Sequence, residues 1–189
     1  MRTASIGGMD VGELVALEAR GGLPELLLFW GHRPPAGGGL GKGCLSQWYP
    51  APFTADGVRY PTAEHYMMAG KARLFGDEAG VGRVLASPDP DAAKGAGRKV
   101  RGFDEETWAR HRYEIVVAAN RAKFGTNPRL RDFLLATAGK VLVEASPYDT
   151  VWGIGLSADQ PEARRPSAWR GLNLLGFALM DVRDELAAG

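Results

Sequence analysis

Apolar side chains recur at helical spacing along most of the chain beyond residue 60, which predicts a protein built mainly of amphipathic helices. The clearest helix begins after Asp104, carries two glutamates in its first turn and stops at Gly125. Thr62 is placed to cap another helix that runs to about Leu74, because its side-chain oxygen can accept a hydrogen bond from a first-turn N–H. Shorter helices are predicted before Pro88, around 91–95, from Pro128 onward and over 174–186.

Three short apolar runs, 26–30, 58–60 and 141–144, have the length and composition of strands. Asp56-Gly57 is a typical turn before the second of them. The segment 33–43 holds two prolines and five glycines, so it is either a mobile linker or a loop whose backbone approaches a ligand closely. With no internal repeat, these elements predict an α+β fold, a helix-rich single domain with a small β-sheet.

The first 25 residues form a separate part of the pattern. Val11 and Leu14 belong to one short amphipathic helix that ends at Gly21-Gly22. We therefore divide the chain into an N-terminal extension, 1–25, and one domain, 26–189.

The composition describes a globular chain with almost balanced charge. Hydrophobic residues make up 45% of the 189, enough for a sizeable core. The 23 basic side chains nearly balance the 22 acidic ones. Any contact with nucleic acid therefore has to rest on a local patch. No run is apolar enough to span a membrane, no secretion signal is evident, and the single cysteine, Cys44, suits a reducing compartment. We expect a cytoplasmic protein with no membrane partner.

Several familiar kinds of catalytic site are missing from the sequence. It has no phosphate-binding glycine loop, zinc-spaced Cys/His set, dinucleotide fingerprint or serine nucleophile elbow. The three histidines are scattered along the chain. We therefore expect neither a metal nor a cofactor, and the candidates that remain are polar and aromatic side chains.

Glu64 and Lys71 are the first candidate pair. They are seven positions apart on one predicted helix, and two helical turns return nearly to the same face, so both can reach one pocket. A carboxylate and an amine on a common face tune each other's pKa and serve acid–base or covalent catalysis. A charge pair on the protein surface has the same spacing, and spacing by itself favours that simpler interpretation.

A second cluster follows the predicted strand 141–144. Asp149 lies in the next loop, and Trp152 precedes Gly153 and Gly155, which permit close backbone approach. An aromatic face beside a carboxylate suits the stacking of a base or ribose while a charge acts on the sugar. A buried tryptophan that anchors a turn gives the same pattern.

Four further side chains have structural explanations beside functional ones. Trp108 lies on the apolar stripe of its helix, which favours core packing. Lys123 lies near the end of that helix, where a cation complements the helix dipole. Arg98 belongs to a basic run, 98–101, that is either a solvated loop or a phosphate site. Asn173 stands where it can cap the last helix.

Segments spread over residues 27–186 fit one family pattern in order and spacing: Leu45-Ser46 through Phe53, Tyr60 to Met67, Lys71-Ala72, Ala93 to Arg98, Phe103 to Trp108, Lys123-Phe124, Leu142 to Ala145, Asp149, Trp152 to Gly155 and Trp169 to Gly176. Together they resemble the NADAR family, also called the YbiA-like family. The resemblance implies a YbiA-like fold and N-glycosidase activity. The substrates it implies are ADP-ribosylated guanine in nucleic acid, which we favour here, or ribosylated riboflavin-pathway intermediates.

The resemblance also assigns roles to residues. It implies that Glu64, Trp108 and Asp149 are needed for activity and that Lys71 acts covalently. In both substrates C1′ of the ribose is bonded to an exocyclic amine, so a neutral Lys71 can exchange onto C1′ as a Schiff base while Glu64 moves protons. We expect substrate contacts from Ser46, Tyr66, Arg98, Lys123, Trp152, Gly153, Gly155 and Asn173.

Two alternatives remain open at this point. Direct hydrolysis through an oxocarbenium-like state would leave Lys71 a binding role only. A module that binds NAD or ADP-ribose without turnover would need neither Glu64 nor Lys71. The sequence leaves the oligomeric state unknown.

Overall fold

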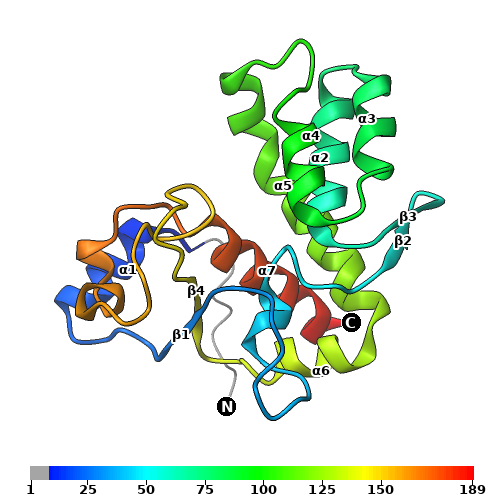
Figure 1. Cartoon of the computed structure of the whole chain (residues 1–189). Coiled ribbons are helices and arrows are strands. Elements are labelled where there is room, and N and C mark those ends of the chain that lie inside the picture. The colour runs from blue at the N-terminus through cyan, green and yellow to red at the C-terminus, as the bar shows by residue number, and fades with distance from the viewer. Residues whose placement is uncertain (1–8) are drawn as a thin grey trace. The chain divides into compact units, whose positions relative to one another are not determined.

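The structure is a computed structural model that describes residues 9–189. The chain forms two compact units: unit 1 holds the residues up to Ser46 together with 131–189, and unit 2 holds the continuous segment 47–130. Figure 1 labels the elements of both. Unit 1 is therefore discontinuous in sequence, and unit 2 lies between its two halves along the chain.

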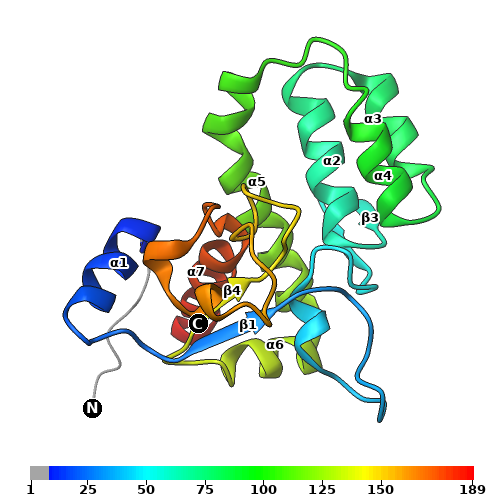
Figure 2. The same ribbon diagram turned by 60° about the vertical axis from the view of Figure 1, so that its left-hand side comes forward.

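Unit 1 is centred on two parallel strands, β1 (Leu26–Phe29) and β4 (Val141–Glu144), in which Phe29 pairs with Glu144. Helix α7 (Leu174–Ala188) packs against β4 (Figure 2). Gly176 permits this close packing, because a Cβ at that position would collide with the carbonyl oxygen of Leu142. The buried core of these elements includes Leu28, Phe29, Val141, Leu142, Val143, Leu175, Leu179 and Val182.

Helix α1 (Val11–Ala19) begins at Asp10, whose side chain accepts a hydrogen bond from the N–H of Glu13 in a capping box. Leu14 is fully buried, and a carboxylate oxygen of Glu18 accepts a hydrogen bond from the N–H of Ser167 at 2.9 Å. The predicted N-terminal helix is confirmed and is held against the short helix Pro166–Ala168. The predicted division of the chain at residue 25 stays a prediction. Residues 1–8 of the predicted N-terminal extension lie outside the residues that the structure describes.

Unit 2 is a packed group of helices in which α2 contacts each of the other three (Figure 1). Small residues allow the close contacts: a Cβ on Gly97 would collide with Met68, and one on Gly70 would lie 2.9 Å from Ile115. Each helix starts at a residue whose side-chain oxygen accepts a hydrogen bond from a first-turn N–H, as predicted for α2. These helices and their capping residues are α2 (Ala63–Leu74, Thr62), α3 (Glu78–Leu85, Asp77), α4 (Pro90–Gly97, Asp89) and α5 (Glu105–Thr126, Asp104).

Unit 2 also contains a β-hairpin, β2 (Phe53–Ala55) with β3 (Val58–Tyr60). Its turn residues Asp56 and Gly57 both have positive φ, 50° and 75°, which matches the twist of the paired strands. Strand β2 was not predicted, and the described residues contain two separate two-stranded sheets instead of one.

Helix α6 (Pro128–Leu135) leads the chain from unit 2 back into unit 1. Short helical turns occupy Lys42–Leu45 and Pro161–Arg164. The predicted helix-rich α+β fold is confirmed. Across residues 9–189, no helix combines the length and apolar character that a membrane span requires.

Candidate active site

Lys71, near the end of α2, lies against two aromatic rings. Its Nζ is 3.9 Å from the centre of the Phe103 ring and 5.5 Å from that of the Trp108 ring. Burial lowers the pKa of Lys71 below its ordinary value, because desolvation disfavours the ammonium form, while the charge of Glu105 acts in the opposite direction. The ring faces attract a cation, so they also limit the decrease. Lys71 therefore presents a larger neutral fraction than a solvated lysine does.

Glu64 lies in the first turn of α2, where the positive end of the helix dipole favours a carboxylate. Its side chain is almost fully buried, since the residue is only 2% exposed. Its N–H donates to the carbonyl oxygen of Gln47 at 3.0 Å, which fixes the start of the helix. The helix places Glu64 and Lys71 on one face, about 10 Å apart along its axis. The interpretation as a solvated surface pair is therefore wrong.

Lys123 is fully buried, with Nζ 4.9 Å from the ring centre of Phe124 and 5.8 Å from that of Tyr49. Lys123 does lie in the last turn of α5, where a cation complements the helix dipole, as predicted, but its full burial was not expected. Asn120 is also fully buried, and its Nδ2 donates to Oε1 of Gln47 at 2.9 Å. Asn120 was not predicted, because it belongs to no local pattern, whereas Gln47 lies in the segment Leu45-Ser46 through Phe53 that carries the family resemblance.

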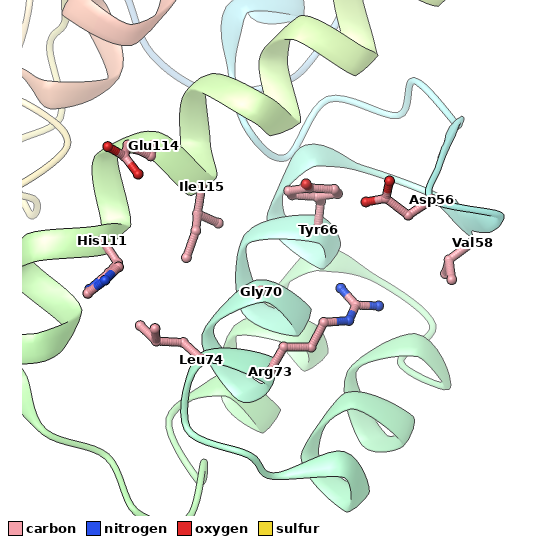
Figure 3. A pocket seen from close by; sticks show the side chains of 9 residues that line it. All are labelled: Asp56, Val58, Tyr66, Gly70, Arg73, Leu74, His111, Glu114 and Ile115. Carbon is pink, nitrogen blue, oxygen red and sulfur yellow. The ribbon is translucent and has the colours of Figure 1, made fainter.

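Tyr66 lies on a different face of α2 from Glu64, because two positions turn a helix by about 200°. It lines a groove of about 640 Å³ between α2, α5 and the hairpin turn, together with Arg73 and His111 (Figure 3). Burial, helped by the charge of Asp56, raises the pKa of Tyr66. Its role in substrate binding stays a prediction, and the groove is separate from the face that carries Lys71.

Within the basic run 98–101, Arg101 is hydrogen-bonded to the carboxylate of Asp77. Arg101 donates to Asp77 from its backbone N–H at 3.0 Å and from its guanidinium at 3.1 and 3.2 Å. The bond from the Arg101 N–H is the main cause that lowers the pKa of Asp77 to about 2. The guanidinium of Arg101 therefore forms a salt bridge with Asp77. Arg98 and Lys99, both exposed, remain the candidates for phosphate binding.

In unit 1, Asp149 organises the loop that follows β4. Its Oδ1 accepts hydrogen bonds from the N–H groups of Val151 at 2.9 Å and Trp152 at 2.7 Å. Its carbonyl oxygen accepts another from the N–H of Gly155, which has φ +68°. A Cβ on Gly153 would lie 2.8 Å from the carbonyl oxygen of Glu144. The glycines do permit close backbone approach, and the partner is the protein's own backbone.

Asn173 precedes α7 but does not cap it with its side chain. It is fully buried in a left-handed conformation with φ +52°. Its Nδ2 donates to the carbonyl oxygen of Leu142 and its Oδ1 accepts from the N–H of Glu144, both at 2.9 Å. The capping interpretation is wrong, because this amide joins α7 to β4. Ser46, 8% exposed, follows the turn Lys42–Leu45 in the same unit.

We predict that Asn173→Ala destabilises the protein by about 2–5 kcal/mol, because it leaves two buried backbone groups without partners and keeps a strained φ. Asn173→Gly loses the same two hydrogen bonds but adopts positive φ freely, so it should lose less. Urea unfolding of the three proteins measures both effects. Equal stability of wild type and the alanine variant would contradict this role.

The predicted site residues therefore fall into two groups. Unit 2 carries Glu64, Lys71, Trp108 and Lys123, with Phe103 as an unpredicted neighbour of the amine, and also Tyr66 and Arg98 on other surfaces. Unit 1 carries Ser46 and the group Asp149, Trp152, Gly153, Gly155 and Asn173.

Comparison with known proteins gives a consistent result. The model of the NADAR domain matches residues 28–187. N-glycosidase R617 of Acanthamoeba polyphaga mimivirus is 42% identical over 146 residues, which cover 75% of this chain and 86% of the relative. The chloroplastic riboflavin biosynthesis protein PYRR of Zea mays is 36% identical over 142 residues, 69% of this chain and 20% of that protein.

The third relative is N-glycosidase YbiA of Escherichia coli, 34% identical over 136 residues, 72% of this chain and 76% of the relative. The NMR structure of E. coli YbiA superimposes with a TM-score of 0.70 at 29% identity, and the match covers 87% of this chain and 86% of that one. On this evidence the chain belongs to the NADAR family and is a hydrolase of the N-glycosidase class.

Proposed function

We propose that this protein removes ADP-ribose from ADP-ribosylated guanine by hydrolysing the bond between C1′ of the ribose and the exocyclic amine of the base. The observation that carries the proposal is the partly buried Lys71 amine, two helical turns from the buried carboxylate of Glu64 on one face of α2. A module that only binds ADP-ribose requires neither group. Hydrolysis of a C–N bond can use the Lys71 amine as a nucleophile and the Glu64 carboxyl group as a proton carrier.

The chemistry begins with opening of the sugar ring, which converts the aminoriboside into an imine at C1′. The neutral amine of Lys71 adds to C1′, and the exocyclic nitrogen leaves with a proton as the free amine of guanine. A C1′–Nζ Schiff base remains. Water then adds to C1′ and the C1′–Nζ bond breaks, which returns the lysine amine and releases ADP-ribose.

Glu64 is the proton carrier in this scheme. Ring opening needs a proton on the ring oxygen, and departure of the base needs one on its nitrogen, so one carboxyl group that gains and loses a proton serves both steps. Trp108 lies beside Lys71, with its ring centre 5.5 Å from Nζ, and we propose that it forms one wall of the site. Asp149, in unit 1, stays a proposed site residue, and its Oδ1 accepts hydrogen bonds from two N–H groups of its own loop.

A direct experiment offers the purified protein ADP-ribosylated guanine in DNA, in RNA and as a mononucleotide, beside ribosylated flavin precursors. Mass spectrometry detects free ADP-ribose and the unmodified guanine that remains in the strand or nucleotide, and the free amine released from a flavin precursor. Release of ADP-ribose from modified guanine supports the proposal, and reaction with the flavin precursors alone contradicts it.

The second candidate is hydrolysis of a ribosylated riboflavin-pathway intermediate. The similarity to PYRR, a protein named for riboflavin biosynthesis, favours this alternative. The same Lys71 and Glu64 chemistry would apply, since that substrate class also joins C1′ to an exocyclic amine. The two candidates differ in the groups beyond the reacting ribose.

The pH profile of the reaction provides another prediction. The charge of Glu105 raises the pKa of Lys71, and Glu105 also lies 3.6 Å from a guanidinium nitrogen of Arg112. Glu105→Gln removes this negative charge, so it favours the neutral amine of Lys71. In the plot of single-turnover rate against pH, the part of the curve that rises with pH should therefore shift to lower pH. The shift should be small, because Glu105 is 71% exposed and water screens its charge. A shift to higher pH would contradict the assignment.

A further inference from the structure

Phe103 has the most exposed large apolar side chain among the described residues of unit 2, with 42% of the residue exposed. Nζ of Lys71 is 3.9 Å from the centre of its ring, compared with 5.5 Å for the ring of Trp108. An atom so close to the centre lies over the face of the ring, because in the ring plane the hydrogens of the ring would keep it farther away. The face of an aromatic ring attracts a cation at distances up to about 6 Å. Phe103 is therefore the nearer of two aromatic partners of this amine.

The loop that carries Phe103 is fixed on both sides of the ring. Two residues before it, the N–H of Arg101 donates to Oδ2 of Asp77 at 3.0 Å, and Asp77 is buried. Directly after it, Oδ1 of Asp104 accepts a hydrogen bond from the N–H of Thr107 at 2.8 Å, at the start of α5. The ring is therefore held by the hydrogen bonds of its neighbours, although part of it faces solvent.

Helix α2 supports the same ring from a second side. Phe75 is the C-cap of α2, four residues after Lys71, and its ring meets that of Phe103 edge to face, with centroids 5.4 Å apart and planes inclined by 66°. This is a preferred geometry of aromatic pairs. Gly102, with φ +71°, turns the chain just before Phe103. The amine and the ring that it contacts are thus both attached to α2, one by the chain and the other by packing.

The ring adds to the effect of the charged groups around Lys71. Burial lowers the pKa of Lys71, and the charge of Glu105, at the start of α5, acts in the opposite direction. Glu105 is 71% exposed, so water screens its charge, and it also lies 3.6 Å from a guanidinium nitrogen of Arg112. Glu64 lies two turns away on the same helix. The ring of Phe103 is in direct contact with the ammonium group and stabilises it.

We propose that Phe103 is a positioning residue for Lys71: its ring holds the side chain through the ammonium group and releases the amine when the proton has passed to water. This proposal rests on the proposed function, in which Lys71 reaches C1′ as a neutral amine. Because the attraction of the ring depends on the charge, loss of the proton and freedom to move toward C1′ occur together. Phe103 thereby sets the pH at which Lys71 becomes a nucleophile.

Trace acetylation of the lysines tests this contact directly and needs no substrate. Acetic anhydride reacts with the neutral amine, and peptide mass spectrometry measures each lysine separately, with exposed Lys99 as the internal reference. Phe103→Leu keeps an apolar side chain but removes the ring face, so the titration midpoint of Lys71 should move to lower pH. Below the midpoint, acetylation of Lys71 scaled to its plateau at high pH should rise roughly two- to fivefold, as loss of an exposed cation–π contact implies. Phe103→Tyr keeps the ring face and should keep the wild-type midpoint.

The shape of the acetylation curve separates protonation from access. Removal of the ring also opens the amine to the reagent, which multiplies the rate at every pH, whereas a change of protonation moves the midpoint. Phe103→Met, another apolar residue without a ring, should move the midpoint in the same direction and serves if Phe103→Leu folds poorly. An unmoved midpoint in these variants, a move to higher pH, or an equal move in Phe103→Tyr overturns the proposal.

The reaction provides the second part of the test. In Phe103→Leu the pH of the half-maximal single-turnover rate should be lower than in wild type, and Phe103→Tyr should restore the wild-type pH. A structural role of the ring would change the height of the rate curve but not this pH, so a lower plateau with an unmoved half-maximal pH overturns the proposal. If the acetylation midpoint moves as expected but no ribosylated substrate is hydrolysed, the contact between Phe103 and Lys71 is supported and the proposed function alone fails.

Discussion

Lys71→Ala lowers the rate of ADP-ribose release by about 10⁴-fold or more, the scale of loss when a covalent nucleophile is removed. The reason is that the alanine side chain cannot form the C1′–Nζ Schiff base. Borohydride added to wild type during turnover should reduce that intermediate and leave a ribose-containing adduct on Lys71. Peptide mass spectrometry locates the adduct, and Lys71→Ala should show none.

Lys71→Arg is the control that distinguishes the covalent from the direct route. Arginine keeps the positive charge and can lie over Phe103 and Trp108, but its guanidinium stays protonated and forms no Schiff base. The covalent route predicts that this variant is as inactive as Lys71→Ala. Direct hydrolysis, in which the lysine only binds, predicts that it keeps much of the activity. Absence of an adduct together with an active Lys71→Ala protein rules out the covalent route.

Glu64→Ala lowers kcat by about 10²–10⁴-fold, because a positioned acid–base group contributes that much to proton transfer. Glu64→Gln is the sharper variant, since it keeps the size and hydrogen-bonding capacity of the side chain but cannot exchange the proton. It should lose a similar factor. The loss should appear in kcat more than in KM, because the proton moves only during reaction.

Stability measurements accompany the Glu64 variants. Because Glu64 is only 2% exposed, the Tm of Glu64→Gln is measured beside its activity, so that a loss of kcat is not confused with a loss of folded protein. A stable and fully active Glu64→Gln would contradict the catalytic assignment. An inactive variant with a lowered Tm would require single-turnover rates on the folded fraction before kcat is compared.

Helix boundaries were the most predictable part of the fold, because their signals are local. Thr62 caps α2 as predicted, and α5 begins directly after Asp104 as predicted. The side-chain oxygen and the N–H that it accepts from lie three residues apart, so no distant contact is needed to recognise the pattern.

Strand pairing was not predictable to the same degree. The runs of β1 and β4 were recognised as strands, but nothing in either indicates that they pair with each other in parallel. β2 was missed because it has only three residues, too few for a period of two to be recognised. The predicted single sheet became two for this reason.

The candidate site was predictable in its residues and less so in their surroundings. The spacing of Glu64 and Lys71 gives a common face, but the burial of Glu64 depends on elements distant in sequence. Phe103 reaches Lys71 from the loop before α5, and no local pattern links the two. Asn173 was misinterpreted because its left-handed backbone directs the amide to β4 and not to the first turn of α7.

The discontinuity of unit 1 has a consequence for the order of folding. β1 cannot pair with β4 until about 110 intervening residues have been brought together, and closing so long a loop carries a large entropic cost. Unit 2 is continuous and rich in short-range helical contacts, so it can form first and shorten that loop. During synthesis the edges of β1 remain unpaired until β4 has left the ribosome, and premature termination before residue 141 would expose an apolar strand to aggregation.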